Sequence, residues 1–185
     1  MKTTTANTTN PINPMTRIRV EKVTLNIGAG KDQQKLEKGV ALLKYLTGIP
    51  PVKCITQKRI PTWGLRPGLP IGCKLTLRGE KAIDFLKRSL VAKEKMLSLK
   101  NFDERGTVSF GVPEYIDVEG VKYNPEIGTT GFEIAVTLER PGFHVKKRRV
   151  RASRIGGDHN ITKEESIKFF TENFKIKIKE MEAAV

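Results

Sequence analysis

The chain has 185 residues, of which 34 are Lys or Arg and 20 are Asp or Glu, giving a net charge of +14. Its length suits one domain with a hydrophobic core, and its composition, 38% hydrophobic and 29% charged, is that of a folded protein rather than a disordered one. The sequence lacks the ~18 consecutive apolar residues of a membrane span, so we expect no membrane partner. Two cysteines exclude a disulfide framework and favour a reducing, cytoplasmic setting.

Residues 1–15 are rich in Thr and Asn, which predicts a disordered N-terminal tail. We expect residues 16–180 to form a single domain, followed by a short tail at 181–185. From Val23 onward apolar and polar residues alternate, which predicts a half-buried strand that ends at Gly28-Ala29-Gly30. Helical spacing of apolar residues then predicts a helix that ends at Thr47-Gly48 and buries Leu36, Val40, Leu43 and Leu46.

Two further strands are predicted around residues 52–57 and 71–78. The sequence between them, KRIPTWGLRPGLP, contains three prolines and two glycines, which prevent a regular element. A second helix over about 80–91 is expected to bury Ile83, Leu86 and Leu90, and strands follow around 108–112 and 132–138. A last helix begins at Thr162, where Glu165 completes a capping box, and is expected to bury Ile167, Phe170 and Phe174. This order predicts an α+β fold: a largely antiparallel sheet with helices packed on one face, which leaves the other face and the loops open.

Two segments, residues 50–78 and 140–154, contain basic residues but no Asp or Glu. Outside them the chain is close to neutral, with 21 basic and 20 acidic residues. Two concentrated positive segments on a neutral body are typical of a protein that binds a polyanion. The basic residues are Lys53, Lys58, Arg59, Arg66, Lys74 and Arg78 in the first segment, and Arg140, Lys146, Lys147, Arg148, Arg149, Arg151 and Arg154 in the second.

The outward positions of the predicted strands carry hydroxyl, amide and basic groups, with Glu133 and Glu139 only at the margins. A plain solvated sheet face shows the same alternation. However, this mixture also contacts phosphate and 2′-hydroxyl oxygens, and both acid-free segments leave from this sheet. We therefore predict that the face and two basic arms grip one RNA. The outward residues are Thr24, Asn26, Lys74, Thr76, Arg78, Ser109 and Thr137.

Each basic segment allows two interpretations. Trp63 and Arg66 can stack on an exposed base or ribose, or Trp63 can pack the loop against the body. The run KKRRVR at 146–151 can be a solvated or localisation-type patch, or it can bind RNA phosphates. Five basic residues in six repel one another, so order in this run requires a counter-charge.

Other chemistries fit the sequence poorly. Gly28-Ala29-Gly30 lacks the third glycine of a dinucleotide fingerprint, because Gln33 stands in its place. Four potential metal ligands, Cys54, Cys73, His144 and His159, have no paired spacing, so we read the cysteines as structural thiols and expect no cofactor. An RNA-processing enzyme that uses His144 or His159 is the alternative function, but no nucleophile motif accompanies them, and we do not expect an enzyme.

Three motifs of this sequence closely resemble one family. VEKVTLNIGAG (20–30), LPIGCKLTLRGEKAIDFLKR (69–88) and NFDERGTVSFGV (101–112) are similar to the ribosomal protein L5 family of the large subunit, which binds 5S rRNA. The likeness extends from about residue 16 to residue 175. The long basic loop and ITKEESIKFF (161–170) resemble the archaeal and eukaryotic branch, and we expect an archaeal member.

The resemblance implies a structural role in the central protuberance of the cytoplasmic ribosome, with 5S rRNA and 23S-type rRNA as partners. It implies that Asn26 and Thr76 contact 5S rRNA, that residues 57–69 reach the P-site tRNA, and that small-subunit ribosomal protein S13 lies across an intersubunit bridge. The partner of the second basic segment is hypothesised to be rRNA near the central protuberance. The predicted 5S rRNA surface is Thr24, Asn26, Thr56, Lys74, Thr76 and Arg78; the tRNA loop is Lys58, Arg59, Thr62, Trp63 and Arg66; the additional rRNA contacts are Lys146, Lys147, Arg148, Arg149, Arg151 and Arg154.

Overall fold

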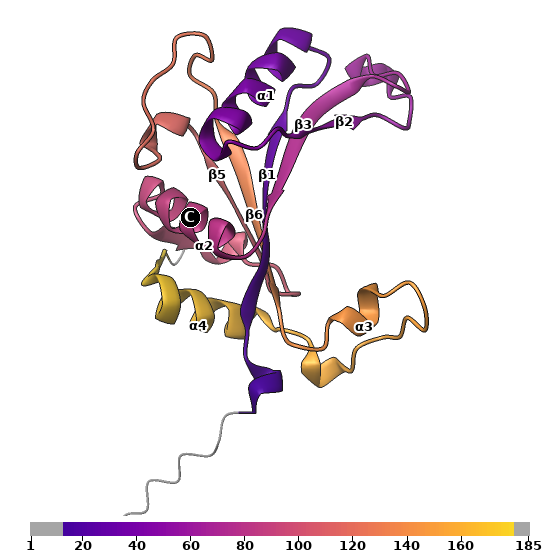
Figure 1. The fold of residues 1–185 in the computed structure, drawn as a ribbon, viewed down its shortest axis with the longest axis vertical. Helices are drawn as coiled ribbons and strands as arrows, with labels where there is room; N and C mark the ends of the chain where they lie inside the picture. The colour runs from indigo at the N-terminus through magenta and orange to yellow at the C-terminus, as the bar shows by residue number, and fades with distance from the viewer. Residues whose placement is uncertain (1–12, 180–185) are drawn as a thin grey trace, which may run out of the picture.

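A five-stranded antiparallel sheet forms the centre of the protein, whose computed structural model describes residues 13–179 (Figure 1). The strand order is β2-β3-β1-β6-β5. The strands span Arg19–Gly28 (β1), Val52–Ile55 (β2), Pro70–Leu77 (β3), Thr107–Val112 (β5) and Phe132–Glu139 (β6). The predicted α+β fold with a largely antiparallel sheet is confirmed.

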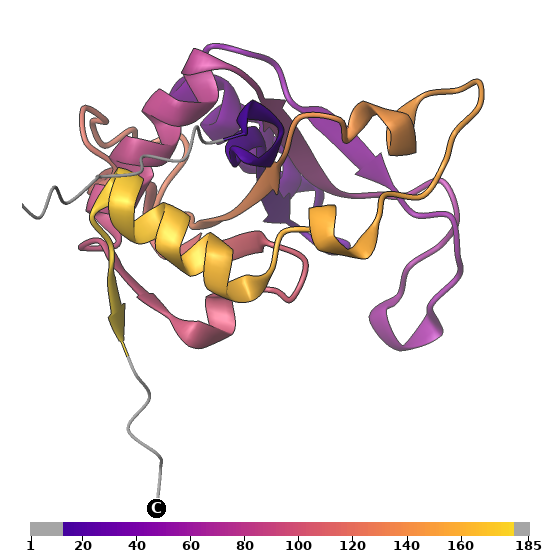
Figure 2. The same cartoon turned by 90° about the horizontal axis from the view of Figure 1, so that it is seen from below.

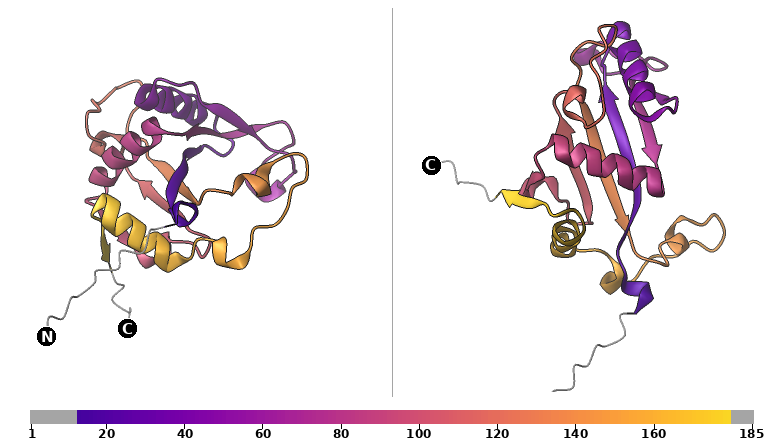
Figure 3. Two further views of the ribbon diagram at one scale, coloured as in Figure 1. Left: turned by 60° about the horizontal axis from the view of Figure 1, so that its bottom comes forward. Right: turned by 60° about the vertical axis from the view of Figure 1, so that its left-hand side comes forward.

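Three helices bury their apolar stripes on one face of this sheet: α1 (Gln33–Thr47), α2 (Glu80–Ala92) and α4 (Lys163–Phe174). Helix α1 ends where Gly48 takes a left-handed conformation at φ 71°, as the sequence predicted. Helix α4 begins at the predicted capping box, in which the Glu165 N–H donates to the Thr162 hydroxyl and the Thr162 N–H to the Glu165 carboxylate. The opposite face of the sheet carries no helix in the described part of the chain (Figure 3).

Two glycines allow close contacts around β1 and β3: Gly39 lets α1 approach the sheet, and Gly72 lets β3 approach β1. A Cβ at Gly39 of α1 would lie 3.2 Å from Ile27 Cγ2 and 3.3 Å from Cys73 Sγ, so α1 rests directly on β1 and β3. A Cβ at Gly72 would lie 2.6 Å from the carbonyl oxygen of Ile27, so only glycine fits between β3 and β1 there. These contacts fix the pairing of β1 with β3, which positions the residues on the opposite face.

The core differs in detail from the predicted set of residues. Leu36, Leu43, Leu46, Leu86, Leu90 and Phe170 are buried as predicted, whereas Val40, Ile83, Ile167 and Phe174 are only half-buried. Phe85 of α2 is 1% exposed and packs against Phe132 of β6, with ring centroids 6.2 Å apart. The buried face of α2 is therefore rotated about the helix axis relative to the predicted one, so that it includes Ala82, Phe85 and Ser89.

Several short elements were not predicted. A two-stranded parallel sheet joins β4 (Met96–Ser98) to β7 (Lys177–Lys179), and one helical turn, α3 (His144–Lys147), lies inside the second basic segment. Short 3-10 turns complete the fold: η1 (Pro14–Thr16), η2 (Pro61–Trp63), η3 (Leu99–Asn101), η4 (Tyr115–Asp117) and η5 (Gly157–His159).

The predicted tails fall mostly outside the described residues. This holds for residues 1–12 of the N-terminal tail and for the whole C-terminal tail at 181–185. Residues 14–16 form η1, and the side chain of Asn13 accepts a hydrogen bond from the Met15 N–H. Within residues 13–179, no helix has both the length and the apolar character needed to cross a membrane.

Candidate nucleic-acid interface

The face of the sheet opposite the helices, here called the open face, carries the polar positions of β1 and β3. Val23, Leu25 and Ile27 point into the core, so their neighbours in sequence point outward. In the strand register Thr24 lies opposite Thr76, and Asn26 lies opposite Lys74. The prediction that these side chains share one face is confirmed by this register.

A row of small side chains crosses the middle of the open face. Thr24 pairs with Thr76 on one side and with Ala135 on the other, and Ala135 pairs in turn with Ser109. Small side chains let another backbone approach the sheet, and three of these four offer a hydroxyl group. Basic side chains lie on both sides of the row, with Lys74 toward one end of the strands and Lys22 and Arg78 toward the other. This arrangement suits a phosphate–sugar backbone lying across the strands.

Acidic side chains on the open face hold several of these polar groups in place. Asn26 donates to the Glu133 carboxylate at 3.1 Å, and Arg19 contacts Glu139 at 2.7 Å. Glu139 also accepts from Lys147 at 3.4 Å. Glu133 and Glu139, predicted to lie only at the margins, therefore engage the polar groups of the face directly.

Glu21 is the most buried acid of this network and was not singled out from the sequence. It follows Val20 at an irregularity in the pairing of β1 with β6, and its side chain is 8% exposed. Its carboxylate lies 2.5 Å from Lys147 Nζ and 3.5 Å from Arg78 Nη1. Burial raises the pKa of this carboxyl, but hydrogen bonding and charge from Lys147, with smaller contributions from Lys22 and Arg78, outweigh burial and lower the pKa overall. Glu21 therefore stays ionised and supplies part of the counter-charge that the KKRRVR run requires.

Thr56 does not lie on the open face. The residue is 8% exposed, and its hydroxyl donates to the carbonyl oxygen of Leu69 at 3.0 Å. Thr56 thus closes the base of the loop between β2 and β3, and we correct its place in the predicted 5S rRNA surface to a structural one.

The loop between β2 and β3, here called the hairpin arm (residues 56–69), is an ordered projection. Its backbone is closed by hydrogen bonds between Thr56 and Leu69 and by two between Ile60 and Leu65. Leu65 is 5% exposed and fills the inside of the arm, whereas Trp63 is 67% exposed. Trp63 therefore does not pack the arm against the body, and its stacking on a base or ribose stays a prediction. The other predicted tRNA-loop residues, Lys58, Arg59, Thr62 and Arg66, are also exposed.

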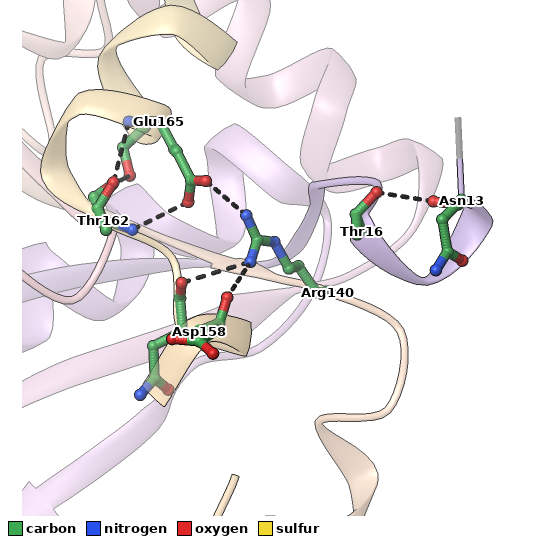
Figure 4. A network of polar contacts seen from close by, with 8 residues as sticks. Asn13, Thr16, Arg140, Asp158, Thr162 and Glu165 are labelled. Atoms are coloured by element: carbon green, nitrogen blue, oxygen red, sulfur yellow. Dashed lines mark hydrogen bonds and ion pairs between the residues drawn. The ribbon is translucent and has the colours of Figure 1, made fainter. Parts of the chain in front are cut away.

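The second basic segment begins with a buried arginine whose charge is used inside the protein. Arg140 is 7% exposed, and its guanidinium contacts the Glu165 carboxylate at 2.7 Å and the Asp158 carbonyl oxygen at 3.1 Å (Figure 4). Arg140 thereby ties the end of β6 to the capping box of α4. Arg140 is therefore not available to RNA, although the sequence places it among the basic residues of the second segment.

The rest of that segment, here called the basic arm (residues 143–154), projects from the end of β6. Lys147 fastens it to the open face through Glu21 and Glu139. Arg148 Nε donates to the carbonyl oxygen of Arg151, which holds the loop in shape. Among the described residues no acid pairs with the other predicted contacts, which are all exposed: Lys146, Arg148, Arg149, Arg151 and Arg154.

A groove of about 820 Å³ lies beside the basic arm. Phe143, Ile155 and Ile161 give it apolar walls, and Lys146, Arg154 and Arg105 give it positive charge. Arg105 lies outside the second basic segment in the sequence, so the sequence alone does not place it beside the arm.

The two arms lie at opposite ends of the open face and on the same side of the molecule (Figures 1 and 2). The hairpin arm leaves from the end where Gly28 pairs with Gly72, and the basic arm leaves from the end where Arg19 pairs with Glu139. The ten residues of β1 between these ends span about 30 Å at ~3.3 Å per residue. The structure thus brings together the face and both arms, as the sequence predicted.

His159 and the two cysteines have structural surroundings, whereas His144 is exposed. His159 Nε2 lies 2.8 Å from the carbonyl oxygen of Pro141, and its ring packs edge-on against Phe143. Cys54 and Cys73 are free thiols on the paired strands β2 and β3, and burial followed by the charge of Cys54 raises the pKa of Cys73 to about 11. Within residues 13–179 no group of three or more His, Cys, Asp or Glu side chains gathers as a metal site.

Comparisons with known proteins cover nearly the whole chain. A model of ribosomal protein L5 matches residues 13–66, and a model of the C-terminus of the same ribosomal family matches residues 70–169. The large ribosomal subunit protein uL5 of Nanoarchaeum equitans is 50% identical over 166 residues, which cover 89% of this chain and 98% of that protein. The uL5 protein of Sulfurisphaera tokodaii is 44% identical over 173 residues, which cover 93% of this chain and 98% of that protein. The uL5 protein of Pyrobaculum aerophilum is 46% identical over 157 residues, which cover 85% of this chain and 88% of that protein.

Proposed function

The chain belongs to the ribosomal protein L5 family, in its archaeal branch, and is an RNA-binding constituent of the large ribosomal subunit; from this premise we propose that its open face binds 5S rRNA. The observation that carries the proposal is the helix-free row Thr76, Thr24, Ala135 and Ser109, with basic side chains on both sides. Hydroxyl and amide groups bind sugar and phosphate oxygens, and Lys74 and Arg78 neutralise phosphates. In this role the protein helps to anchor 5S rRNA in the central protuberance of the cytoplasmic ribosome.

The hairpin arm is proposed to reach the P-site tRNA. Its exposed indole provides a flat surface on which a base or ribose can stack, and Lys58, Arg59 and Arg66 provide positive charge around it. Because hydrogen bonds close the arm, little ordering is required when the tRNA arrives.

The basic arm is proposed to bind 23S-type rRNA beside the 5S rRNA. Its exposed basic residues project from the same side as the open face, and the groove next to them adds Arg105. Contact with small-subunit protein S13 across an intersubunit bridge completes the proposed set of partners and follows from the family alone.

The proposal is tested by the affinity of the protein for 5S rRNA. Asn26→Ala combined with Thr76→Ala removes one amide and one hydroxyl from the open face. The control, Gln34→Ala with Thr171→Ala, removes the same groups from exposed positions on α1 and α4. We expect the first variant to bind about 30-fold more weakly at matched salt, since two hydrogen bonds contribute ~1 kcal/mol each, and the control to bind normally. Equal affinities of the two variants would contradict the assignment of the open face.

RNA cleavage by the histidines is the alternative function, and the surroundings of His159 do not favour it. The His159 ring is engaged by Pro141 and Phe143, and the relatives reported above are ribosomal proteins. Incubation of labelled RNA with the wild type and with His159→Ala tests this alternative: cleavage by the wild type alone would support it.

A further inference from the structure

Six lysines gather around the small sheet of β4 and β7, although the sequence separates them into two groups. They are Lys93, Lys95, Lys100, Lys175, Lys177 and Lys179, here called the lysine patch. Parallel pairing sets Met96 beside Lys177 and Ser98 beside Lys179, so both ends of the patch meet at one surface. These lysines belong to the part of the chain in which basic and acidic residues are nearly equal in number, so the sequence does not mark them as a basic segment.

The charge of the patch is not neutralised within the described part of the protein. Five of its lysines are exposed and Lys93 is half-buried, and none has an ion-pair partner among residues 13–179. In the sequence, Glu94 lies within the segments that carry the patch, and Glu180 and Glu182 follow Lys179. Within the described residues the patch therefore keeps its positive charge.

The backbone beneath the patch is strained. Four non-glycine residues among those described have positive φ angles, and three of them, Glu94, Lys95 and Lys175, lie here at 53–54°. Positive φ angles are unfavourable for non-glycine residues, and strain of this kind concentrates at functional sites. The strained turn is fixed from both sides, since the Lys95 N–H donates to Leu90 and its carbonyl accepts from Lys177.

The polar groups of the patch indicate what it can recognise. A groove of about 520 Å³ runs beside Lys93 and Lys179, past Ser98 and Asn101. The Ser98 hydroxyl donates to Asn101 Oδ1, and Asn101 Nδ2 donates to Ser109, so these groups are already occupied. Ammonium groups remain as the free donors, and they bind phosphates as point charges without reading bases.

The patch lies away from both arms (Figures 1 and 2). Strand β7 lies on the opposite side of the molecule from the hairpin arm and the basic arm, beyond the β5 edge of the sheet. RNAs held by the open face and by the two arms therefore leave the patch uncovered. We propose that the lysine patch binds the phosphate backbone of a further RNA segment, distinct from those at the open face and the arms and independent of its sequence.

Lysine reactivity tests this proposal without 5S rRNA. The wild type is acetylated with a limiting amine-reactive ester, alone and with a 20-base-pair RNA duplex of arbitrary sequence, and each lysine is quantified by mass spectrometry. We expect at least threefold protection of Lys95, Lys177 and Lys179 by the duplex, and no protection of the exposed Lys44, Lys81 and Lys87 on α1 and α2. Unchanged reactivity of the patch would overturn the proposal, as would equal protection by a polyglutamate peptide of matched charge.

Binding of a further RNA is tested separately with the protein saturated by 5S rRNA. The wild type should then capture the labelled duplex, whereas Lys95→Gln, Lys177→Gln and Lys179→Gln together should weaken capture about tenfold and make its log–log salt slope shallower by about 2 to 3. The charge-matched control changes Lys44, Lys81 and Lys87 to Gln and should capture the duplex like the wild type. If both variants captured the duplex equally weakly, the net charge of the protein and not the lysine patch would determine capture, and the proposal would be overturned. If 5S rRNA fails to bind at the open face, the proposed function fails, and the acetylation result still decides the patch.

Discussion

Lys147 of the basic arm and Glu21 of β1 form an ion pair, with Nζ 2.5 Å from Oε1, at the edge of the open face. Through this pair a segment with five basic residues in six is fastened to the sheet that it extends. The same carboxylate contacts Arg78, so one buried acid positions cations of both the arm and the face.

Replacement of Glu21 by Gln should therefore loosen the basic arm. The substitution keeps the size of the side chain but leaves Lys147 with Glu139 as its remaining acid. We expect trypsin to cleave within residues 146–154 several times faster than in the wild type. The control Glu133→Gln lies on the same face but contacts Asn26, and cleavage of that variant should be unchanged. Equal rates for all three proteins would show that Glu21 does not hold the arm.

The stabilisation from Glu21 should depend on pH. Because the folded state lowers the pKa of Glu21, its contribution is fully present above the ordinary value of 4.5 and is lost as the pH falls through the lower pKa of the folded protein. Thermal unfolding of the wild type and of Glu21→Gln should differ at pH 7 and converge as the pH falls below 4.5 and through the lowered pKa of the folded protein. A difference that grows on acidification would contradict this assignment.

Arg140→Met should be destabilising without altering the exposed RNA surface. It leaves the Asp158 and Asn160 carbonyl groups and Glu165 without their partner. Because the Glu165 side chain is 37% exposed, we expect a cost of about 2–3 kcal/mol, less than the ~3–5 kcal/mol of a fully buried pair. Urea unfolding measures the loss. As a comparison, Arg149→Met on the exposed arm should stay within about 0.5 kcal/mol of the wild type.

Trp63, the only tryptophan of the chain, reports on the hairpin arm. Its fluorescence should be that of a water-exposed indole, and tRNA should quench it while 5S rRNA alone should not. Trp63→Ala should leave the unfolding midpoint unchanged and weaken tRNA binding. Leu65→Ala empties the inside of the same arm and should destabilise it. Quenching by 5S rRNA alone would move that RNA to the hairpin arm.

The two thiols should differ in reactivity. Cys73 is fully buried with a pKa of about 11, so its reactive thiolate is scarce at pH 8, whereas Cys54 is partly exposed. Iodoacetamide at pH 8 should therefore modify Cys54 and spare Cys73 until the protein unfolds. Mass spectrometry of the labelled peptides distinguishes the two, and early labelling of Cys73 would indicate a loosened contact between α1 and the sheet.

The sequence predicts which strand residues point outward, because alternate residues of a strand point to opposite faces and the apolar ones mark the buried face. Val23, Leu25 and Ile27 are enough to place Thr24 and Asn26 on the open face. Contacts between distant segments could not be predicted in this way. The pairing of Met96 with Lys177 involves three-residue strands with little pattern of their own, and the partners of Glu21 and Arg140 depend on how separate elements approach. The exposure of Trp63 likewise follows from Leu65, which fills the inside of the arm in its place.

Directed cleavage from a tethered iron chelate tests whether 5S rRNA lies on the open face. In a Cys54→Ser background, the chelate is attached at Thr76→Cys on the open face or at Lys87→Cys on α2, and 5S rRNA is added. We expect strand scission of the 5S rRNA from position 76 and none above background from position 87. Scission from position 87 with none from position 76 would place 5S rRNA on the helical side and contradict the account.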